Sequence, residues 1–153
     1  MGDYKDDLAT RGLDAFAPYL MNRIMRRYNQ TLQTRMADYD LSAPKMRVLA
    51  SLAVRDGLTV NELAVYSIAE QPTMSRTLDQ LERDGLIART VSETDSRVRH
   101  CSLTDAGREM YRLTWPEMDA AERAMFQGVS DEDRAHLLAT LGRMLENIKQ
   151  NDF

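Results

Sequence analysis

The chain has 153 residues, of which 43% are hydrophobic and 29% charged, with 24 acidic against 20 basic side chains. This length suits one ordinary domain, and the composition argues against a wholly disordered chain. The most compact apolar run, residues 48–54, is far shorter than the roughly 18 residues that a membrane helix needs, so no membrane span is expected.

Residues 1–12 are expected to form a mobile tail. The first seven, MGDYKDD, are acidic and lack the apolar stretch of a secretory signal, which favours a cytoplasmic protein. Because Cys101 is the single cysteine, the chain cannot form an internal disulfide or a site with several cysteine ligands. His100 and His136 are too far apart in sequence to suggest a metal site, so neither a metal nor a cofactor is expected.

An amphipathic helix is expected over residues 13–36, because apolar side chains recur there every three or four positions. Its polar side carries three arginines, Arg23, Arg26 and Arg27. A second helix is expected over residues 43–54. Ser42 is a suitable N-cap for it, and Pro44 is tolerated in its first turn, where backbone N–H groups lack partners.

Two further helices form the centre of the chain. Gly57 can adopt the backbone conformation that ends a helix, and Thr59 with Glu62 makes a T-x-x-E capping box that starts the next one. A longer helix is expected over residues 72–84, with Pro72 at its first position. No strong capping side chain precedes Pro72, so a bound phosphate is a candidate partner for this helix end.

The helix over residues 72–84 has two distinct sides. If Met74 faces inward, Leu78 and Leu81 fall within about 40° of it. The outward side carries small polar, amide and charged groups: Thr73, Ser75, Arg76, Asp79, Gln80 and Arg83. Such a surface suits the floor of a DNA major groove, where arginine pairs with guanine and glutamine with adenine. A polar helix face is more commonly an ordinary solvent-exposed surface, so this pattern alone does not establish DNA binding.

From residue 86 the apolar period changes to two, which predicts a two-stranded hairpin. Arg97 lies in its polar turn, and Arg99 lies on the returning strand, on the same side as Cys101 and Leu103. An arginine-bearing hairpin directly after such a helix favours DNA binding, because its tip can reach a neighbouring minor groove that attracts cations. Arg99 has two open roles: support of this DNA-facing tip, or pairing with a nearby carboxylate.

Two long helices are expected after the hairpin, one after Thr104 and one after Ser130. With the first helix, their apolar stripes exceed what the small central region of helices and hairpin, residues 42–103, can cover. Exposed stripes of this size favour the pairing of two chains, and packing of these helices within one chain is the alternative.

Residues 81–109, LERDGLIARTVSETDSRVRHCSLTDAGRE, resemble the signature of the MarR (multiple antibiotic resistance regulator) family. The shared pattern is L-E-x-x-G-L-I-x-R, a wing with D-x-R, and L-T-x-x-G. The resemblance implies a mainly α fold with a small β hairpin. In this fold a winged helix-turn-helix domain over residues 42–103 is flanked by helical dimerisation regions over residues 13–41 and 104–153.

The same resemblance assigns roles within the wing. Arg97 matches the arginine that enters the minor groove, and Asp95 matches the acidic residue that orients the wing. Ser96 stands where the family often has a basic residue, which predicts a weaker hold on DNA. Ser42 and Lys45 are further candidates for contacts with DNA phosphates.

The sequence therefore predicts a DNA-binding transcriptional regulator and not an enzyme, since no G-x-S-x-G, phosphate-binding glycine loop or paired histidines occur. The expected partners are double-stranded DNA with a pseudo-palindromic operator and a second copy of the chain. The resemblance adds a small aromatic or phenolic effector that binds between the dimer helices and the winged domain and releases a repressor from DNA. Two alternatives stay open: a winged-helix adaptor that binds protein, and a redox sensor that uses Cys101.

Overall fold

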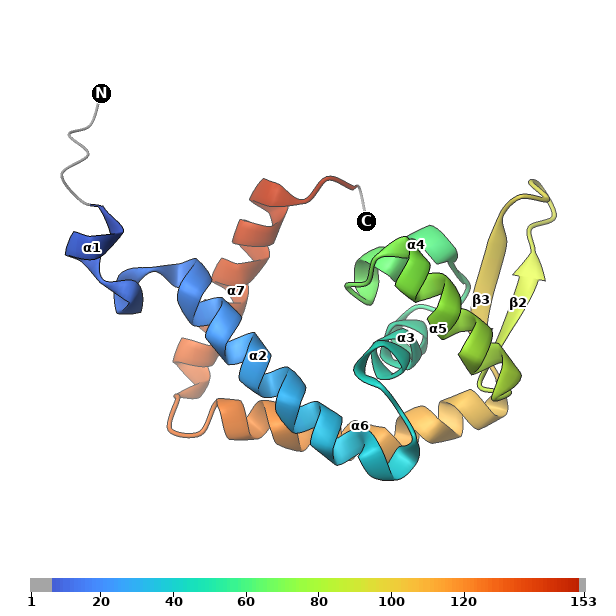
Figure 1. Cartoon of the computed structure of the whole chain (residues 1–153), viewed down its shortest axis with the longest axis horizontal. Helices are drawn as coiled ribbons and strands as arrows, with labels where there is room; N and C mark the ends of the chain where they lie inside the picture. The colour runs from blue at the N-terminus through green and yellow to red at the C-terminus, as the bar shows by residue number, and fades with distance from the viewer. Residues whose placement is uncertain (1–6, 152–153) are drawn as a thin grey trace.

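The computed structural model describes residues 7–151, which form seven α-helices, two 3-10 turns and one small sheet within that range (Figure 1). The α-helices are α1 (Leu8–Arg11), α2 (Ala17–Met36), α3 (Ala43–Val54), α4 (Val60–Tyr66), α5 (Gln71–Arg83), α6 (Asp105–Met125) and α7 (Asp131–Ile148). The strands are β1 (Leu58–Thr59), β2 (Ile87–Val91) and β3 (Arg99–Leu103). None of the helices in the described part of the chain is long and apolar enough to cross a membrane.

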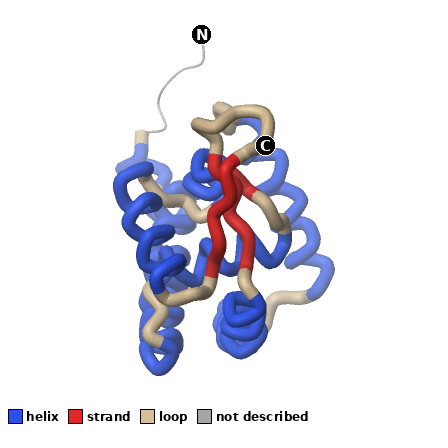
Figure 2. The backbone as a smooth tube through the Cα atoms, turned by 90° about the vertical axis from the view of Figure 1, so that its right-hand side faces the viewer, coloured by secondary structure: helices blue, strands red, loops and turns tan. Residues whose placement is uncertain are grey.

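The sheet is antiparallel and has the strand order β1-β3-β2. Figure 2 draws its strands in red among the surrounding helices. In the predicted hairpin, Ile87 lies opposite Leu103. The sequence did not reveal β1, in which Leu58 lies opposite Cys101. Two residues are too few to show a period of two, and they lie directly before a helix start, so the third strand had no local signal.

Local side-chain caps set the helix starts, as predicted. The hydroxyl of Thr59 accepts a hydrogen bond from the backbone N–H of Glu62 at 3.3 Å, and the Glu62 carboxylate accepts one from the Thr59 backbone N–H at 2.8 Å. This reciprocal pair is the capping box of α4. Ser42, Thr104 and Ser130 likewise accept backbone N–H groups at the starts of α3, α6 and α7.

The core lies mainly in the winged unit, which consists of α3, α4, α5 and the sheet, and it extends to Leu32 and Met36 of α2 and Ala121 of α6. All three residues predicted to face inward from α5, namely Met74, Leu78 and Leu81, are fully buried. The first turn of α6 packs against one end of this unit, below it in the view of Figure 1. Gly107 lies so near the Leu86 backbone carbonyl that a Cβ at this position would overlap the carbonyl oxygen, which explains the glycine of the L-T-x-x-G pattern.

The N-terminal region differs from the expected single helix over residues 13–36. Leu13–Ala15 forms a separate 3-10 turn, and α2 starts at Ala17 with proline in its first turn. Residues 8–11, expected within a mobile tail, form α1, because the Asp7 carboxylate accepts the backbone N–H of Thr10 and caps it. The remainder of that tail, residues 1–6, lies outside the described residues.

Candidate nucleic-acid interface

The exposed face of α5 carries the side chains that the sequence predicted. Thr73, Ser75, Arg76, Gln80 and Arg83 are all exposed. Within residues 7–151, the Arg76 guanidinium has no ion pair or hydrogen-bond partner, whereas Arg83 donates its Nε–H to the Asp79 carbonyl at 3.2 Å. Glu70 at the N-cap makes no side-chain hydrogen bond to α5, so the first backbone N–H groups of α5 can bind an external acceptor.

The turn between β2 and β3 is organised by Asp95. One carboxylate oxygen accepts the backbone N–H of Arg97 at 3.0 Å and its Nε–H at 3.1 Å, and the other accepts its Nη2–H at 3.1 Å. These hydrogen bonds lower the pKa of the Asp95 carboxyl below its ordinary value. The Arg97 side chain is nevertheless 88% exposed. The carboxylate thus orients a guanidinium that still points into solvent.

Arg89 joins the wing to α5. From β2 its guanidinium reaches the Asp79 carboxylate at 2.8 Å and the Glu82 carboxylate with Nε at 3.0 Å. The hydrogen bonds that Arg89 donates lower the pKa of Glu82, and the same bonds to Glu82 and Asp79 raise the pKa of Arg89. This contact fixes the wing strand against the helix and offsets part of the negative charge of two carboxylates beside the exposed arginines of α5. The sequence pattern contained Glu82 and Arg89 but did not reveal that they meet across two elements.

Comparisons with known proteins agree with this geometry. A profile of the MarR family matches residues 41–98, the segment from the start of α3 into the wing. The crystal structure of a MarR family transcriptional regulator from Silicibacter pomeroyi matches with a TM-score of 0.91 and 45% sequence identity, over 97% of this chain and 100% of that chain. This chain belongs to the MarR family.

Two further relatives extend the comparison. The transcriptional repressor IacR from Pseudomonas putida is 26% identical over 137 residues, which is 89% of this chain and 79% of IacR. The S. aureus MepR–DNA complex matches with a TM-score of 0.75 and 28% identity, over 86% of this chain and 98% of MepR. The resemblance predicted from residues 81–109 is therefore confirmed, as is the mainly helical winged fold.

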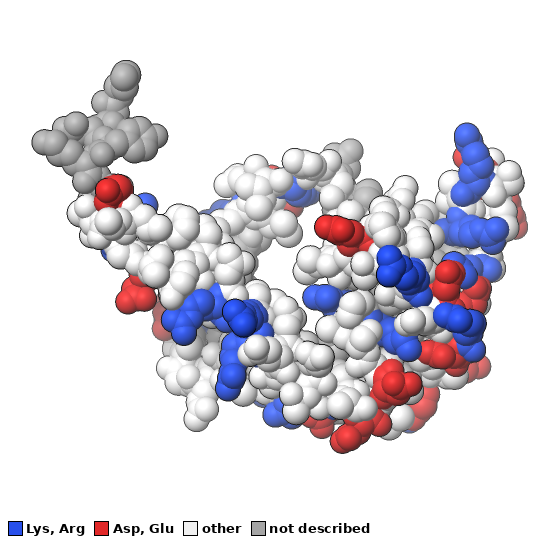
Figure 3. Space-filling model, viewed as in Figure 1, with Lys and Arg blue, Asp and Glu red and all other residues white. Residues whose placement is uncertain are grey.

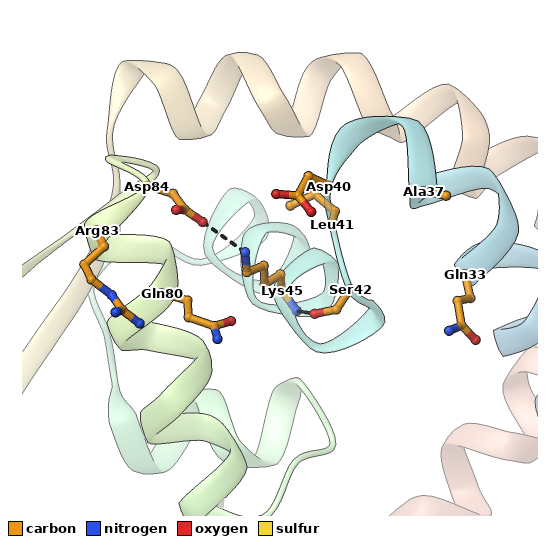
Figure 4. A pocket seen from close by; sticks show the side chains of 9 residues that line it. All are labelled: Gln33, Ala37, Asp40, Leu41, Ser42, Lys45, Gln80, Arg83 and Asp84. Carbon is orange, nitrogen blue, oxygen red and sulfur yellow. Dashed lines mark hydrogen bonds and ion pairs between the residues drawn. The ribbon is translucent and has the colours of Figure 1, made fainter.

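The two candidates for phosphate contacts in this MarR-family chain border an open pocket of about 710 Å³ (Figure 4). Ser42 lies at the start of α3, and Gln80 and Arg83 of α5 line the opposite side, while Gln33 of α2 completes the rim. Lys45 is not a free cation, because its Nζ pairs with the Asp84 carboxylate at 2.9 Å. The pocket is thus lined by residues of α5, of the start of α3 and of the C-terminal half of α2.

The returning strand places the remaining predicted residues. Arg99 is exposed, and with Arg97 it lines a small pocket beside the start of α4. Within residues 7–151 Arg99 makes no ion pair, so the internal pairing considered for it is not found. Cys101 is fully buried, and this burial raises its thiol pKa to about 11. A buried thiol that resists ionisation argues against redox sensing through Cys101.

Proposed function

We propose that this protein is a ligand-responsive repressor that binds a pseudo-palindromic DNA operator as a homodimer. The observation that carries the proposal is the combination of the polar, exposed face of α5 with a wing arginine that a carboxylate holds in place. Figure 3 shows Lys and Arg side chains over α5 and the wing, interspersed with Asp and Glu side chains, in a chain whose net charge is −4. Exposed arginines such as Arg76 and Arg97 on one side of an acidic protein are suited to a polyanion.

Each part of this surface has a proposed role. The residues Thr73, Ser75, Arg76, Gln80 and Arg83 of α5 would lie in the major groove, with the unpaired Arg76 guanidinium reading a guanine. Arg97 would enter the adjacent minor groove in the orientation that Asp95 sets, and Arg99 would contact the backbone beside it. The MepR–DNA complex supports this arrangement, because MepR is a relative with the same fold.

The homodimer is supported by the apolar side chains that one chain leaves exposed. α7 buries none of its residues, and Leu145 and Ile148 are 58% and 74% exposed. The first half of α2 adds Leu20 and Ile24, which are also exposed. A second copy would cover these faces. The dimer would place two copies of α5, the proposed recognition helix, about 34–36 Å apart, which is one turn of DNA.

The proposed effector is a small aromatic or phenolic molecule, bound between the winged unit and the dimerisation helices. The open pocket bordered by Ser42, Gln80 and Arg83 lies at this junction. An occupant would touch side chains of α5 itself. To weaken DNA binding, it must bind the arrangement that does not fit the operator more tightly than the one that does.

The test begins with selection of duplexes from a random pool and measurement of affinity by fluorescence anisotropy at several salt concentrations. We expect log K to fall linearly with log salt. Arg76→Ala should cost about 1–3 kcal/mol on the selected duplex and relax one base position. A loss that is uniform over all sequences would show that Arg76 contacts phosphate and does not read a base.

A second variant, Arg97→Ala, tests the role of the wing in DNA binding. Because this side chain is exposed and bonds only to Asp95 among the described residues, the variant should bind DNA more weakly and melt at the unchanged temperature. If no duplex binds even at low salt, the protein is better described as a winged-helix adaptor for another protein.

A further inference from the structure

One face of α2 combines apolar and basic side chains. Leu20 and Ile24 are 39% and 48% exposed. Arg23 and Arg27 are exposed on the same side of the helix, because at 100° per residue all four side chains fall within an arc of about 100°. We call these four residues the α2 face. It borders a groove of about 420 Å³ between α2 and α6, which is lined by Ile24, both arginines and, from α6, Ala121, Ala124 and Met125.

The arginines of the α2 face have no counter-charge in the described part of the chain. Of the four arginines of α2, Arg35 alone makes an ion pair within residues 7–151, and α2 contains no acidic residue. Arg23 donates a hydrogen bond to the Tyr19 hydroxyl at 3.1 Å, which leaves its charge in place. Figure 3 shows Lys and Arg side chains over α2. The α2 face is therefore suited to a partner surface that combines apolar and acidic side chains.

α7 presents that combination. The helix buries none of its residues, so its apolar stripe is available to a partner. At 100° per residue Asp131 and Asp133 lie about 80° to either side of Leu141, in the middle of this stripe, whereas Glu132 lies opposite it. Both aspartates are exposed, and neither makes an ion pair within residues 7–151, although Asp133 accepts a hydrogen bond from the Ser130 hydroxyl at 2.8 Å. We call the stripe with its two aspartates the α7 face.

We infer that the α2 face of one chain packs against the α7 face of a second copy, with the two arginines paired to the two aspartates of the partner. The inference rests on the proposed function, because it names the contact that forms the proposed homodimer. The apolar stripe of the partner's α7 then covers the groove between α2 and α6. Two-fold symmetry repeats the contact, so each dimer contains it twice.

The pairing of charges gives the dimer selectivity as well as affinity. Opposite charges beside an apolar contact fix the register of the two helices, and like charges in the same place are strongly unfavourable. A protein of the same fold that lacks these charges would have the apolar contact without the ion pairs. The chain should therefore prefer a second copy of itself over such a protein.

The test exchanges the charges of the two faces in the full-length protein. One variant carries Arg23→Glu with Arg27→Glu, and the other carries Asp131→Lys with Asp133→Lys. Either variant alone places like charges together at both contacts of a dimer, so its dissociation constant in sedimentation should rise on the order of 100-fold or more. An equimolar mixture restores opposite charges at both contacts. Native mass spectrometry of the mixture should then show heterodimers.

Two matched controls reverse charges on the same helices outside the two faces. Arg26 lies about 160° from Ile24 around α2, and Glu132 lies opposite the α7 stripe. Arg26→Glu and Glu132→Lys should leave the dimer dissociation constant unchanged. The inference is wrong if the two reversed variants dimerise as tightly as the unaltered protein. It is also wrong if their mixture stays monomeric while circular dichroism shows both to be folded, because the arginines then meet other carboxylates.

The unaltered protein gives a measurement that does not depend on the folding of a variant. Because salt screens ion pairs, the dimer dissociation constant should rise with the concentration of sodium chloride. A constant that stays the same or falls would overturn the inference, since an apolar contact has no charges to screen. If the unaltered protein is monomeric at every concentration, the proposed homodimer itself fails. The two failures are therefore distinguishable.

Discussion

The winged unit and the last helix use the same amphipathic pattern with opposite results. In the winged unit, Leu63, Leu78 and Leu81 are fully buried. In α7 the apolar stripe stays exposed, and the described contacts that hold this helix lie at its start, where Arg134 pairs with Glu122 at 2.7 Å and lies over the Phe126 ring. One chain is thus sufficient to complete the winged unit but not to cover α7. The stability of the two regions should respond differently to mutation and to protein concentration.

The largest expected effect compares a leucine in each region. Leu78→Ala should lower the free energy of unfolding by about 2–5 kcal/mol, because it leaves a cavity in a closed core. This loss of unfolding free energy should not depend on dimer formation, because Leu78 packs within one chain. Chemical denaturation followed by circular dichroism measures it.

Leu145→Ala is the counterpart in α7. In an isolated chain this exposed side chain would contribute little, so any substantial loss must come from a partner that covers it. We expect the variant to shift the monomer–dimer equilibrium toward monomers in sedimentation experiments. An unchanged equilibrium would mean that Leu145 lies outside the dimer interface.

The two helical glycines give the next effect. Gly107→Ala places a Cβ against the Leu86 backbone carbonyl and should cost about 3 kcal/mol, since neither backbone segment can move freely. Gly142→Ala in α7 meets no atom within 4 Å and should instead stabilise the helix by about 0.5–1 kcal/mol. Melting curves of the two variants give the comparison. Destabilisation by Gly142→Ala would reveal close approach of a second chain at that turn.

The sequence was sufficient to predict which side of an element a residue occupies. The helical period placed Met74 and Leu78 inside and Arg76 outside, and capping residues such as Thr59 located the helix starts. These features depend on residues a few positions apart, so local patterns contain them. The switch to a period of two likewise predicted β2 and β3.

Contacts between elements were beyond the same reasoning. Lys45 was a candidate for a phosphate contact, and the sequence did not reveal that it pairs with Asp84, 39 residues away. Arg89 is the last residue of the L-E-x-x-G-L-I-x-R pattern, but the pattern did not reveal that it joins the wing to α5 through Asp79 and Glu82. Such pairs depend on the packing of two elements against each other, which neither periodicity nor capping specifies.

A smaller effect is expected from the helix caps of the two regions. Thr59→Ala removes the hydroxyl that caps α4 and should cost about 1 kcal/mol, while Thr59→Ser should retain most of the stability. Ser130→Ala removes the corresponding cap of α7, where the Ser130 hydroxyl accepts the Asp133 N–H at 3.1 Å. The cost of Thr59→Ala should appear in the denaturation curve. If α7 is ordered mainly by a partner chain, the cost of Ser130→Ala should instead appear as weaker dimerisation in sedimentation.

The smallest effect concerns Cys101, which lies in the centre of the winged unit. Its thiol pKa is about 11 in the folded chain, above the ordinary value of about 8.5, because burial disfavours the thiolate. The unfolded chain therefore loses this proton first as pH rises, and the stability from the neutral thiol declines between about pH 8.5 and 11. Cys101→Ala should lack this part of the decline, so the unfolding free energies of the unaltered protein and the variant should approach each other as pH rises.

At pH 8 the thiol of the folded protein should react with iodoacetamide far more slowly than the thiol of the unfolded protein. Rapid alkylation of the folded protein would show that the winged unit opens at this strand, and it would restore redox sensing as a function to consider.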